Sequence, residues 1–157
     1  MVSLRKWKLD DAKQLCRIIN DKRITDNLRS LPNHYTEKDA TDYISFCLNS
    51  DENSNFCYAI LLDDVVVGSI GAFRQTDIHF RTAEIGYYVG VEYWGKGVAT
   101  SAVKQLCEII FNETDIVRLF AEPLPKILQV AEFLKRTVLF AKERFVKTHT
   151  RTVALWI

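Results

Sequence analysis

The chain opens with hydrophobic residues at helical spacing. Residues 3–7 predict a short strand, and residues 10–21 predict an amphipathic helix capped by Asp10 or Asp11. The apolar positions of this helix recur at the intervals that one buried face requires; they are Ala12, Leu15, Cys16, Ile18 and Ile19. The opening therefore predicts one strand followed by one helix with a single buried face.

A second helix is expected over residues 36–48. Thr36 and Asp39 have the spacing of a capping box, in which each residue bonds to a backbone amide of the other. Residues 22–35, between the two helices, are polar and predict a short helix that ends before Pro32, because the residue before a proline avoids the helical conformation.

The hydrophobic period then changes from helical to strand-like. Residues 55–63 and 65–73 are rich in β-formers and are joined by two aspartates, which predicts a β-hairpin. The later elements are a strand at 82–90, a helix at 97–112, a strand at 117–124, a helix at 125–136 and a β-capable segment at 151–157. A meander followed by a βαβ crossover predicts an α/β (α+β) fold over 1–157: one domain with a mixed, mostly antiparallel sheet flanked by helices.

Composition excludes several classes of protein. The chain has 157 residues, of which 48% are hydrophobic, enough for one domain core. Its 21 Lys and Arg balance 20 Asp and Glu and are scattered, so no nucleic-acid partner is expected. No apolar run reaches membrane-spanning length, and the start of the chain lacks the apolar stretch of a secretory signal. We expect a cytoplasmic protein without a membrane partner.

Cysteine and histidine positions give no sign of a metal site. The four cysteines are far apart and lie among apolar neighbours, as buried thiols in a reducing compartment do; they are Cys16, Cys47, Cys57 and Cys107. The three histidines, His34, His79 and His149, are isolated from one another, whereas a metal needs clustered ligands.

The strongest candidate for chemistry is the glycine-rich turn between the third strand of the meander and the following helix. It places Gly95, Lys96 and Gly97 at the helix N-terminus, where unpaired amides and the helix dipole favour an anion. The pattern is neither a P-loop nor a dinucleotide fingerprint, because Lys96 precedes the second glycine and Thr100 replaces the third. Taken alone, the turn is equally typical of an ordinary loop that enters a helix.

The surrounding block decides between these interpretations. Residues 83–111, AEIGYYVGVEYWGKGVATSAVKQLCEIIF, resemble the acetyl-CoA-binding core of the Gcn5-related N-acetyltransferases (GNAT), and within them the ribosomal-protein alanine N-acetyltransferases. The family pattern Gln/Arg-x-x-Gly-x-Gly/Ala falls on residues 94–99, with Trp94 in the first place, a substitution associated with this branch. The resemblance extends over the opening strand and helix and reaches Pro125.

This resemblance implies an acetyl-CoA-dependent N-acetyltransferase. An acetyl group would pass from the thioester to a primary amine, either a protein N-terminus or a small amine, by direct attack. The backbone of Val89 and Val91 would pair with the pantetheine arm of coenzyme A, although both residues could serve packing alone. By the same likeness, six amides would hold the pyrophosphate: those of Gly95, Lys96, Gly97, Val98, Ala99 and Thr100.

The resemblance also nominates catalytic residues. Glu84 matches a strand glutamate that some members use as a base toward the acceptor ammonium; the alternative is a solvated strand residue. The amide of Tyr88 or Val89 would polarise the acetyl carbonyl. Strand alternation places Tyr88 on the face of Glu84, so Tyr88 rather than Tyr87 is the candidate acid for the thiol, unless both are core aromatics.

The acceptor is expected between the segment at 22–35 and residues 73–80. Five side chains of the first segment could read it, or could belong to a solvated loop; they are Arg23, Arg29, Asn33, His34 and Tyr35.

After Pro125 the resemblance ends. Family members continue with Glu-Asn, a helix, Gly-Phe and a final hairpin, and the asparagine contacts the cofactor. Here Ile127 stands in the asparagine's place, and residues 126–157 contain no glycine for the turn of a hairpin. Without that hairpin a sheet edge would be exposed, which favours a homodimer. The alternative function is therefore a catalytically impaired acyl-CoA-binding or dimerising domain that keeps the scaffold.

We hypothesise that residues 126–157 are a frameshifted reading of an ordinary family tail. A shifted codon consists of the last base of one residue's codon and the first two bases of the next residue's codon. Starting at Lys126–Ile127, such shifted codons permit the sequence Asn-Ile-Ala-Ser-Cys/Arg-Arg-Val-Leu-Glu-Lys-Asn-Gly-Phe. The prediction is that the coding DNA, read in that shifted frame, spells this helix, the Gly-Phe and a final turn. Codons that do not spell it identify genuine divergence instead.

Overall fold

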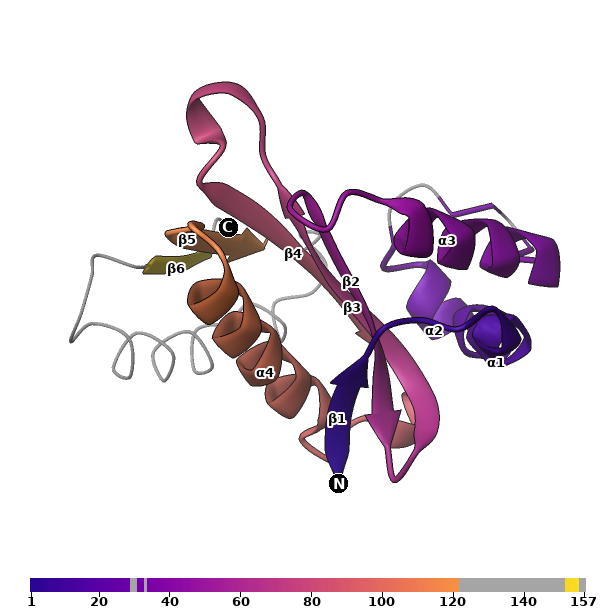
Figure 1. The fold of residues 1–157 in the computed structure, drawn as a ribbon. Coiled ribbons are helices and arrows are strands. Elements are labelled where there is room, and N and C mark those ends of the chain that lie inside the picture. Colours follow the sequence, from indigo (N-terminus) through magenta and orange to yellow (C-terminus); the bar gives the residue numbers. More distant parts are fainter. Residues whose placement is uncertain (29–30, 33, 122–151, 156–157) are drawn as a thin grey trace.

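The computed structural model describes residues 1–28, 31–32, 34–121 and 152–155, which build a six-stranded sheet with helices on both faces (Figure 1). The order of the strands in the sheet follows the order of the chain. They are β1 (Val2–Arg5), β2 (Asn55–Leu62), β3 (Val65–Arg74), β4 (Thr82–Val89), β5 (Arg118–Ala121) and β6 (Thr152–Leu155). β1 to β4 pair antiparallel, whereas β4–β5 and β5–β6 pair parallel.

Among the described residues, four α-helices and three short 3-10 turns lie between the strands. The helices are α1 (Ala12–Ile19), α2 (Lys22–Thr25), α3 (Glu37–Asn49) and α4 (Val98–Glu113). The 3-10 turns are η1 (Leu9–Asp11), η2 (Asp77–His79) and η3 (Val91–Tyr93). The expected α/β class and the mixed, mostly antiparallel sheet flanked by helices are confirmed. The helix expected at 125–136 lies outside the described residues.

Local capping agrees with the sequence at one helix and differs at another. Thr36 and Asp39 form the expected capping box at the start of α3. At α1, by contrast, the first turn is the 3-10 turn η1, and the Asp11 carboxylate accepts hydrogen bonds from Arg5 at 2.7 and 2.9 Å and from the Lys8 amide at 2.9 Å. Asp11 is thus the N-cap residue of α1 by position, as expected, but its side chain makes no capping bond to α1 and instead ties β1 to η1.

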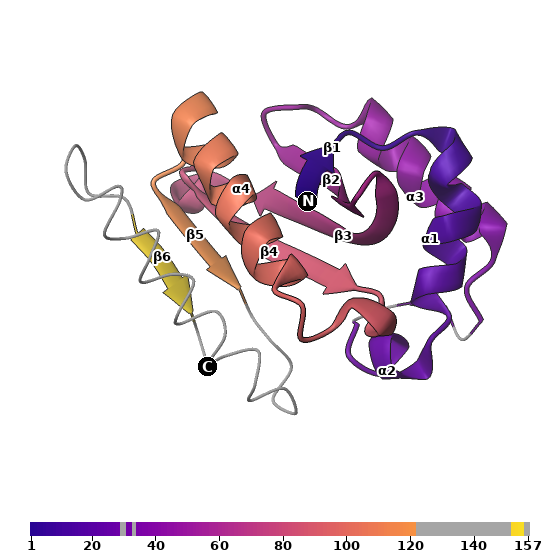
Figure 2. The same cartoon turned by 90° about the horizontal axis from the view of Figure 1, so that it is seen from below.

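Each face of the sheet buries its own core. α4 packs on the face that carries Ile60, Ile70 and Ile85, while α1 and α3 pack on the other face, against Cys57 and Ala59. Burial on both faces explains why β2 and β3 read as nearly continuous hydrophobic runs. Figures 1 and 2 show α1–α3 gathered beside β2 and β3, away from β5 and β6. Of the cysteines, Cys47, Cys57 and Cys107 are buried, as expected.

A bulge in β3 lies opposite β2. Ile60 pairs with Gly68 and Leu61 with Val66, so Val67 is the extra residue. A Cβ at Gly68 would lie 2.3 Å from the carbonyl oxygen of Tyr88, which means that only glycine allows β3 and β4 to approach this closely. Gly68 is also the first residue of the β3–β4 ladder, where it pairs with Val89.

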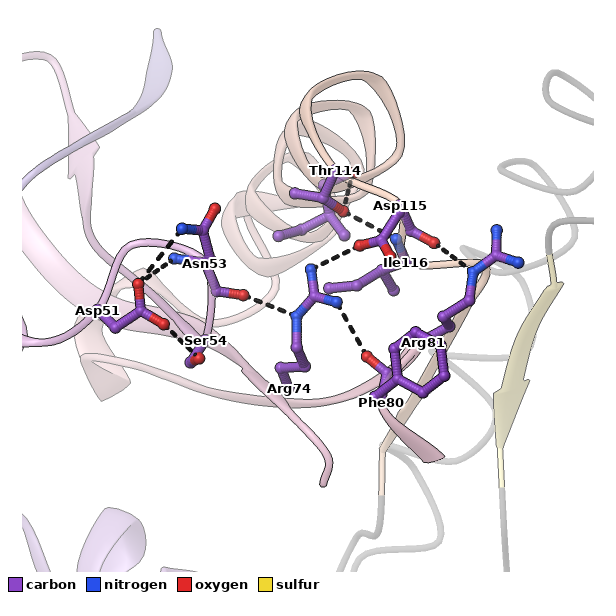
Figure 3. A network of polar contacts seen from close by, with 10 residues as sticks. Asp51, Asn53, Ser54, Arg74, Phe80, Arg81, Thr114, Asp115 and Ile116 are labelled. Atoms are coloured by element: carbon purple, nitrogen blue, oxygen red, sulfur yellow. Dashed lines mark hydrogen bonds and ion pairs between the residues drawn. The ribbon is translucent and has the colours of Figure 1, made fainter. Parts of the chain in front are cut away.

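An arginine fixes the other end of this ladder. Arg74 donates from Nε to the carbonyl of Asn53 at 2.7 Å, from Nη1 to the carbonyl of Phe80 at 3.0 Å and from Nη2 to Asp115 at 2.8 Å (Figure 3). Arg81 donates to the carbonyl of Asp115 at 3.0 Å. The side chain of Arg74 is only 17% exposed, whereas that of Asp115 is 56% exposed. These bonds join β3, the β3–β4 connection and the segment that follows α4.

Within the described ranges, no helix combines the length and the apolar character needed to cross a membrane.

Arg74→Met should lower the free energy of unfolding by about 1–3 kcal/mol, because two carbonyls and a carboxylate lose a charged donor. The hydrogen bond from Arg74 lowers the pKa of Asp115, so this part of the stability exists above the unfolded pKa and is lost as the pH falls. When unfolding free energies are measured in urea, the difference between Arg74→Met and the parent protein should therefore become smaller below a pH of about 4.

Arg23→Met is the matched control. Arg23 also pairs with a carboxylate at 2.7 Å, that of Asp21, but its side chain is 66% exposed. It should therefore change stability less. Equal effects of the two variants would contradict the role assigned to Arg74.

Candidate functional site

Within the described residues, β4 extends beyond its ladder with β5. As far as β5 is described, to Ala121, this parallel ladder consists of three residue pairs, the last of which joins Glu84 to Phe120. β4 itself continues to Val89 and stays paired to β3 throughout. Glu84 therefore stands at a fork in the sheet, and its side chain is half-buried there.

The backbone of Val89 faces the open side of this fork. The amide of Gly90 donates to the carbonyl of Val67 at 2.8 Å, so it points toward β3. Since backbone groups alternate in direction along a strand, the amide and carbonyl of Val89 point away from β3. This orientation is the one that pairing of Val89 with an extended ligand requires.

Trp94 contacts this same backbone. Its indole Nε1 donates to the carbonyl of Val89 at 2.7 Å, while the Trp94 residue as a whole is 51% exposed. Its amide closes η3 by donating to the carbonyl of Val91 at 3.1 Å. The sequence placed Trp94 in a motif but did not indicate this bond, because it depends on how the turn folds back on β4.

The glycine turn leads directly into α4. Gly95 and Gly97 adopt φ of 74° and 73°, the left-handed region that favours glycine, and Gly97 precedes the first residue of the helix. α4 has 16 residues and begins at Val98, so the amides of its first turn lie beside this turn. Lys96 is exposed, with its Nζ 5.5 Å from the centroid of the Tyr93 ring. The turn can therefore bind an anion through its backbone amides and through the positive charge of Lys96.

The fold brings most of the predicted site residues to the fork. Val89 and Val91 lie at the end of β4 and in η3; the predicted anion turn follows them, namely Gly95, Lys96, Gly97, Val98, Ala99 and Thr100. The side chains of Ile85 and Val89 pack toward α4, whereas Tyr88 packs with the core of α1 and α3. By strand alternation Glu84 lies on the side of Tyr88, as expected.

Tyr88 ends in a buried polar cluster. Ser69 Oγ lies 3.1 Å from the hydroxyl of Tyr43, and Ser69 pairs with Tyr88 across β3 and β4. Burial raises the pKa of Tyr88 well above its usual range, although the neighbouring Ser69 hydroxyl acts in the opposite direction. Tyr88 is therefore protonated at neutral pH and is a weaker acid than a solvated tyrosine.

The expected acceptor segment is only partly available to a ligand. Tyr35 is buried in the core of α1 and α3, and burial raises its pKa to about 12. Arg23 pairs with Asp21, and His34 is exposed with φ of 107°. Arg29 and Asn33 lie outside the described residues.

Among the described residues, no group of three or more His, Cys, Asp or Glu side chains is placed to hold a metal ion.

Comparison with known proteins gives a consistent picture. The family model described as "Acetyltransferase (GNAT) domain" matches residues 2–137, beyond Pro125. The chain is 28% identical over 154 residues to an uncharacterized N-acetyltransferase, p20, of Bacillus licheniformis; the match covers 96% of this chain and 84% of that protein. It is also 28% identical over 109 residues to the probable N-acetyltransferase YjcK of Bacillus subtilis (strain 168); this match covers 69% of this chain and 60% of that protein.

Solved structures share the fold at low identity. A ribosomal-protein-S5-alanine acetyltransferase from Vibrio fischeri aligns with a TM-score of 0.75 and 18% identity, covering 87% of this chain and 78% of that one. The aminoglycoside acetyltransferase AAC(6')-Ib in complex with coenzyme A and kanamycin aligns with a TM-score of 0.74 and 18% identity, covering 94% and 100%. The microcin C7 self-immunity acetyltransferase MccE, in complex with acetyl-CoA and AMP, aligns with a TM-score of 0.74 and 20% identity; the match covers 87% of this chain and 77% of that one.

Trp94→Phe should loosen the turn between β4 and α4, because the Val89 carbonyl loses its indole donor. A lost hydrogen bond of about 1 kcal/mol corresponds to roughly fivefold faster local opening. Hydrogen–deuterium exchange of a peptide spanning residues 89–97 measures it. Glu92→Gln, an exposed change in η3, is the control and should leave exchange unchanged. Unaltered exchange in Trp94→Phe would show that the bond does not hold the turn.

Proposed function

Because the chain belongs to the acetyltransferase (GNAT) domain family, with a match that spans residues 2–137, we propose that it transfers an acetyl group from acetyl-CoA to a primary amine. The observation that carries the proposal is the fork: the described ladder of β4 and β5 ends at Glu84, and the glycine turn and the N-terminus of α4 follow directly at the end of β4. The acceptor would be a protein N-terminus or a small amine.

The residues present fit the cofactor. The left-handed turn at Gly95 and Gly97 leads to the first amides of a long helix, the arrangement that holds phosphate groups in proteins. At Gly95 and Gly97 an added Cβ would meet no described atom within 4 Å, so the left-handed backbone, and not crowding, accounts for glycine there. We assign the pyrophosphate to residues 95–100 and the pantetheine arm to the backbone of Val89 and Val91.

When bound, acetyl-CoA supplies the acetyl group as a thioester, and the protein supplies positioning and proton transfer. The amine must lose a proton before it can attack, and the Glu84 carboxylate at the fork would accept it directly or through a water molecule. The Val89 amide, which points to the open side, would donate a hydrogen bond to the carbonyl oxygen under attack. The departing thiolate would take a proton from Tyr88.

The two proposed catalytic residues have different surroundings. Glu84 lies at the fork with a half-buried side chain, which suits a base that both the acceptor and solvent can reach. Tyr88 packs with the core of α1 and α3, and its raised pKa makes it a weak acid. Tyr88 remains the proposed acid, and Tyr88→Phe with an unchanged rate would assign it to packing alone.

Purified protein should release free thiol from acetyl-CoA only when an amine is present. A peptide with an N-terminal alanine, kanamycin and n-butylamine cover the acceptor classes. Because Ile127 replaces the asparagine of the family, cofactor binding should be weak and turnover below the range of about 1–10³ s⁻¹ that most enzymes reach. Calorimetry with acetyl-CoA measures the binding separately.

Glu84→Gln provides the test of the base. It should lower the rate by roughly 10²–10⁴-fold while cofactor binding stays the same. A rate that is undiminished and independent of pH would remove Glu84 as the base. Cofactor binding without thiol release for any amine would favour a non-catalytic acyl-CoA-binding domain, and the absence of both would contradict the proposal.

A further inference from the structure

Two glycines face each other across β3 and β4 on the side of the sheet that carries Glu84. Gly71 pairs with Gly86, and the flanking pairs are Ser69–Tyr88 and Phe73–Glu84. Ser69 contacts Tyr43 of α3, and both Phe73 and Tyr88 pack with the core of α1 and α3. By strand alternation the two glycines share that face, which leaves a gap in its row of side chains.

The ring of Phe73 covers half of this gap. A Cβ at Gly71 would lie 3.2 and 3.3 Å from two ring carbons of Phe73, closer than side chains normally approach. A Cβ at Gly86 would lie 3.9 Å from the nearest ring carbon, which is an ordinary contact. The ring therefore rests against Gly71 and ends at the edge of Gly86.

Gly86 itself is exposed although β4 lies inside the six-stranded sheet. The helices α1–α3 gather beside β2 and β3 (Figures 1 and 2). An exposed backbone floor at Gly86 thus lies between the partly exposed ring of Phe73, the carboxylate of Glu84 and the side chain of Tyr88.

We propose that Phe73 selects the acceptor by its charge. An acceptor amine arrives as an ammonium, and the face of an aromatic ring attracts a cation but not a neutral group of the same shape. Because Phe73 pairs directly with Glu84, the ammonium lies over the ring immediately before it reaches the carboxylate. The missing side chain at Gly86 gives room to the carbon next to the amine, so the floor fits a primary ammonium on an unbranched carbon. The inference rests on the proposed function.

Phe73 could instead serve only to cover the glycines. In that case its replacement by leucine would change stability but would not change the preference for a charged ligand. The ratio of the affinities for a charged ligand and an uncharged ligand of similar shape therefore distinguishes selection by charge from packing alone.

The experiment compares n-butylammonium with 1-butanol, which is similar in shape and uncharged. Ligand-observed NMR titrations on protein saturated with coenzyme A give the two dissociation constants and their ratio. Phe73→Leu should reduce the preference for the ammonium by about two- to fivefold. Phe46→Leu, which removes a 51% exposed phenylalanine from α3, is the control and should leave the preference unchanged.

Gly86→Ala tests the floor without disturbing the fold, since its methyl group would make only an ordinary contact with Phe73. This variant should bind both n-butylammonium and 1-butanol more weakly, while its affinity for acetyl-CoA stays unchanged. An unaltered preference in Phe73→Leu, unaltered binding in Gly86→Ala or no binding of either probe to the parent protein would overturn the inference. Selective binding without thiol release would support it while removing the proposed reaction.

Discussion

The antiparallel ladder between β3 and β4 is the constraint on which the site depends. Its seven residue pairs run from Gly68–Val89 to Arg74–Ala83. This register turns the Val89 backbone toward the open side, sets Phe73 beside Glu84 and places the two glycines opposite each other. A slip of one residue would exchange the two faces of β4 and bury Glu84 under α4. The close approach of the two strands at Gly68 and the bonds of Arg74 lie at the two ends of the ladder.

Much of the fold could be predicted from local patterns. The capping box at Thr36 and Asp39 and the hairpin at Asp63–Asp64 are local signals, and both occur as expected; the two aspartates adopt φ of 48° and 66°. The glycine turn before α4 was also recognisable, because glycines and a helix start lie next to each other in the chain. In each case the interacting groups are close in sequence, so the pattern contains the whole interaction.

The parts of the site that the sequence did not reveal all depend on long-range register. Whether Phe73 lies beside Glu84 or one residue away cannot be read from either strand alone, because the register exists only once β3 and β4 have paired. The bond from the Trp94 indole to Val89 requires the fold of η3. The Asp11 side chain looked like a helix cap for the same reason: its true partner, Arg5, belongs to the preceding strand.

The order of the strands has a consequence for synthesis of the chain. Because spatial order equals sequence order from β1 to β6, each strand that leaves the ribosome meets the free edge of the sheet already formed. No pair has to open to admit a later strand, so the sheet can grow from one side during translation. The first five strands come from residues up to Ala121, so the sheet can take them up in the order in which they are synthesised, and β6 adds last at the free edge of β5.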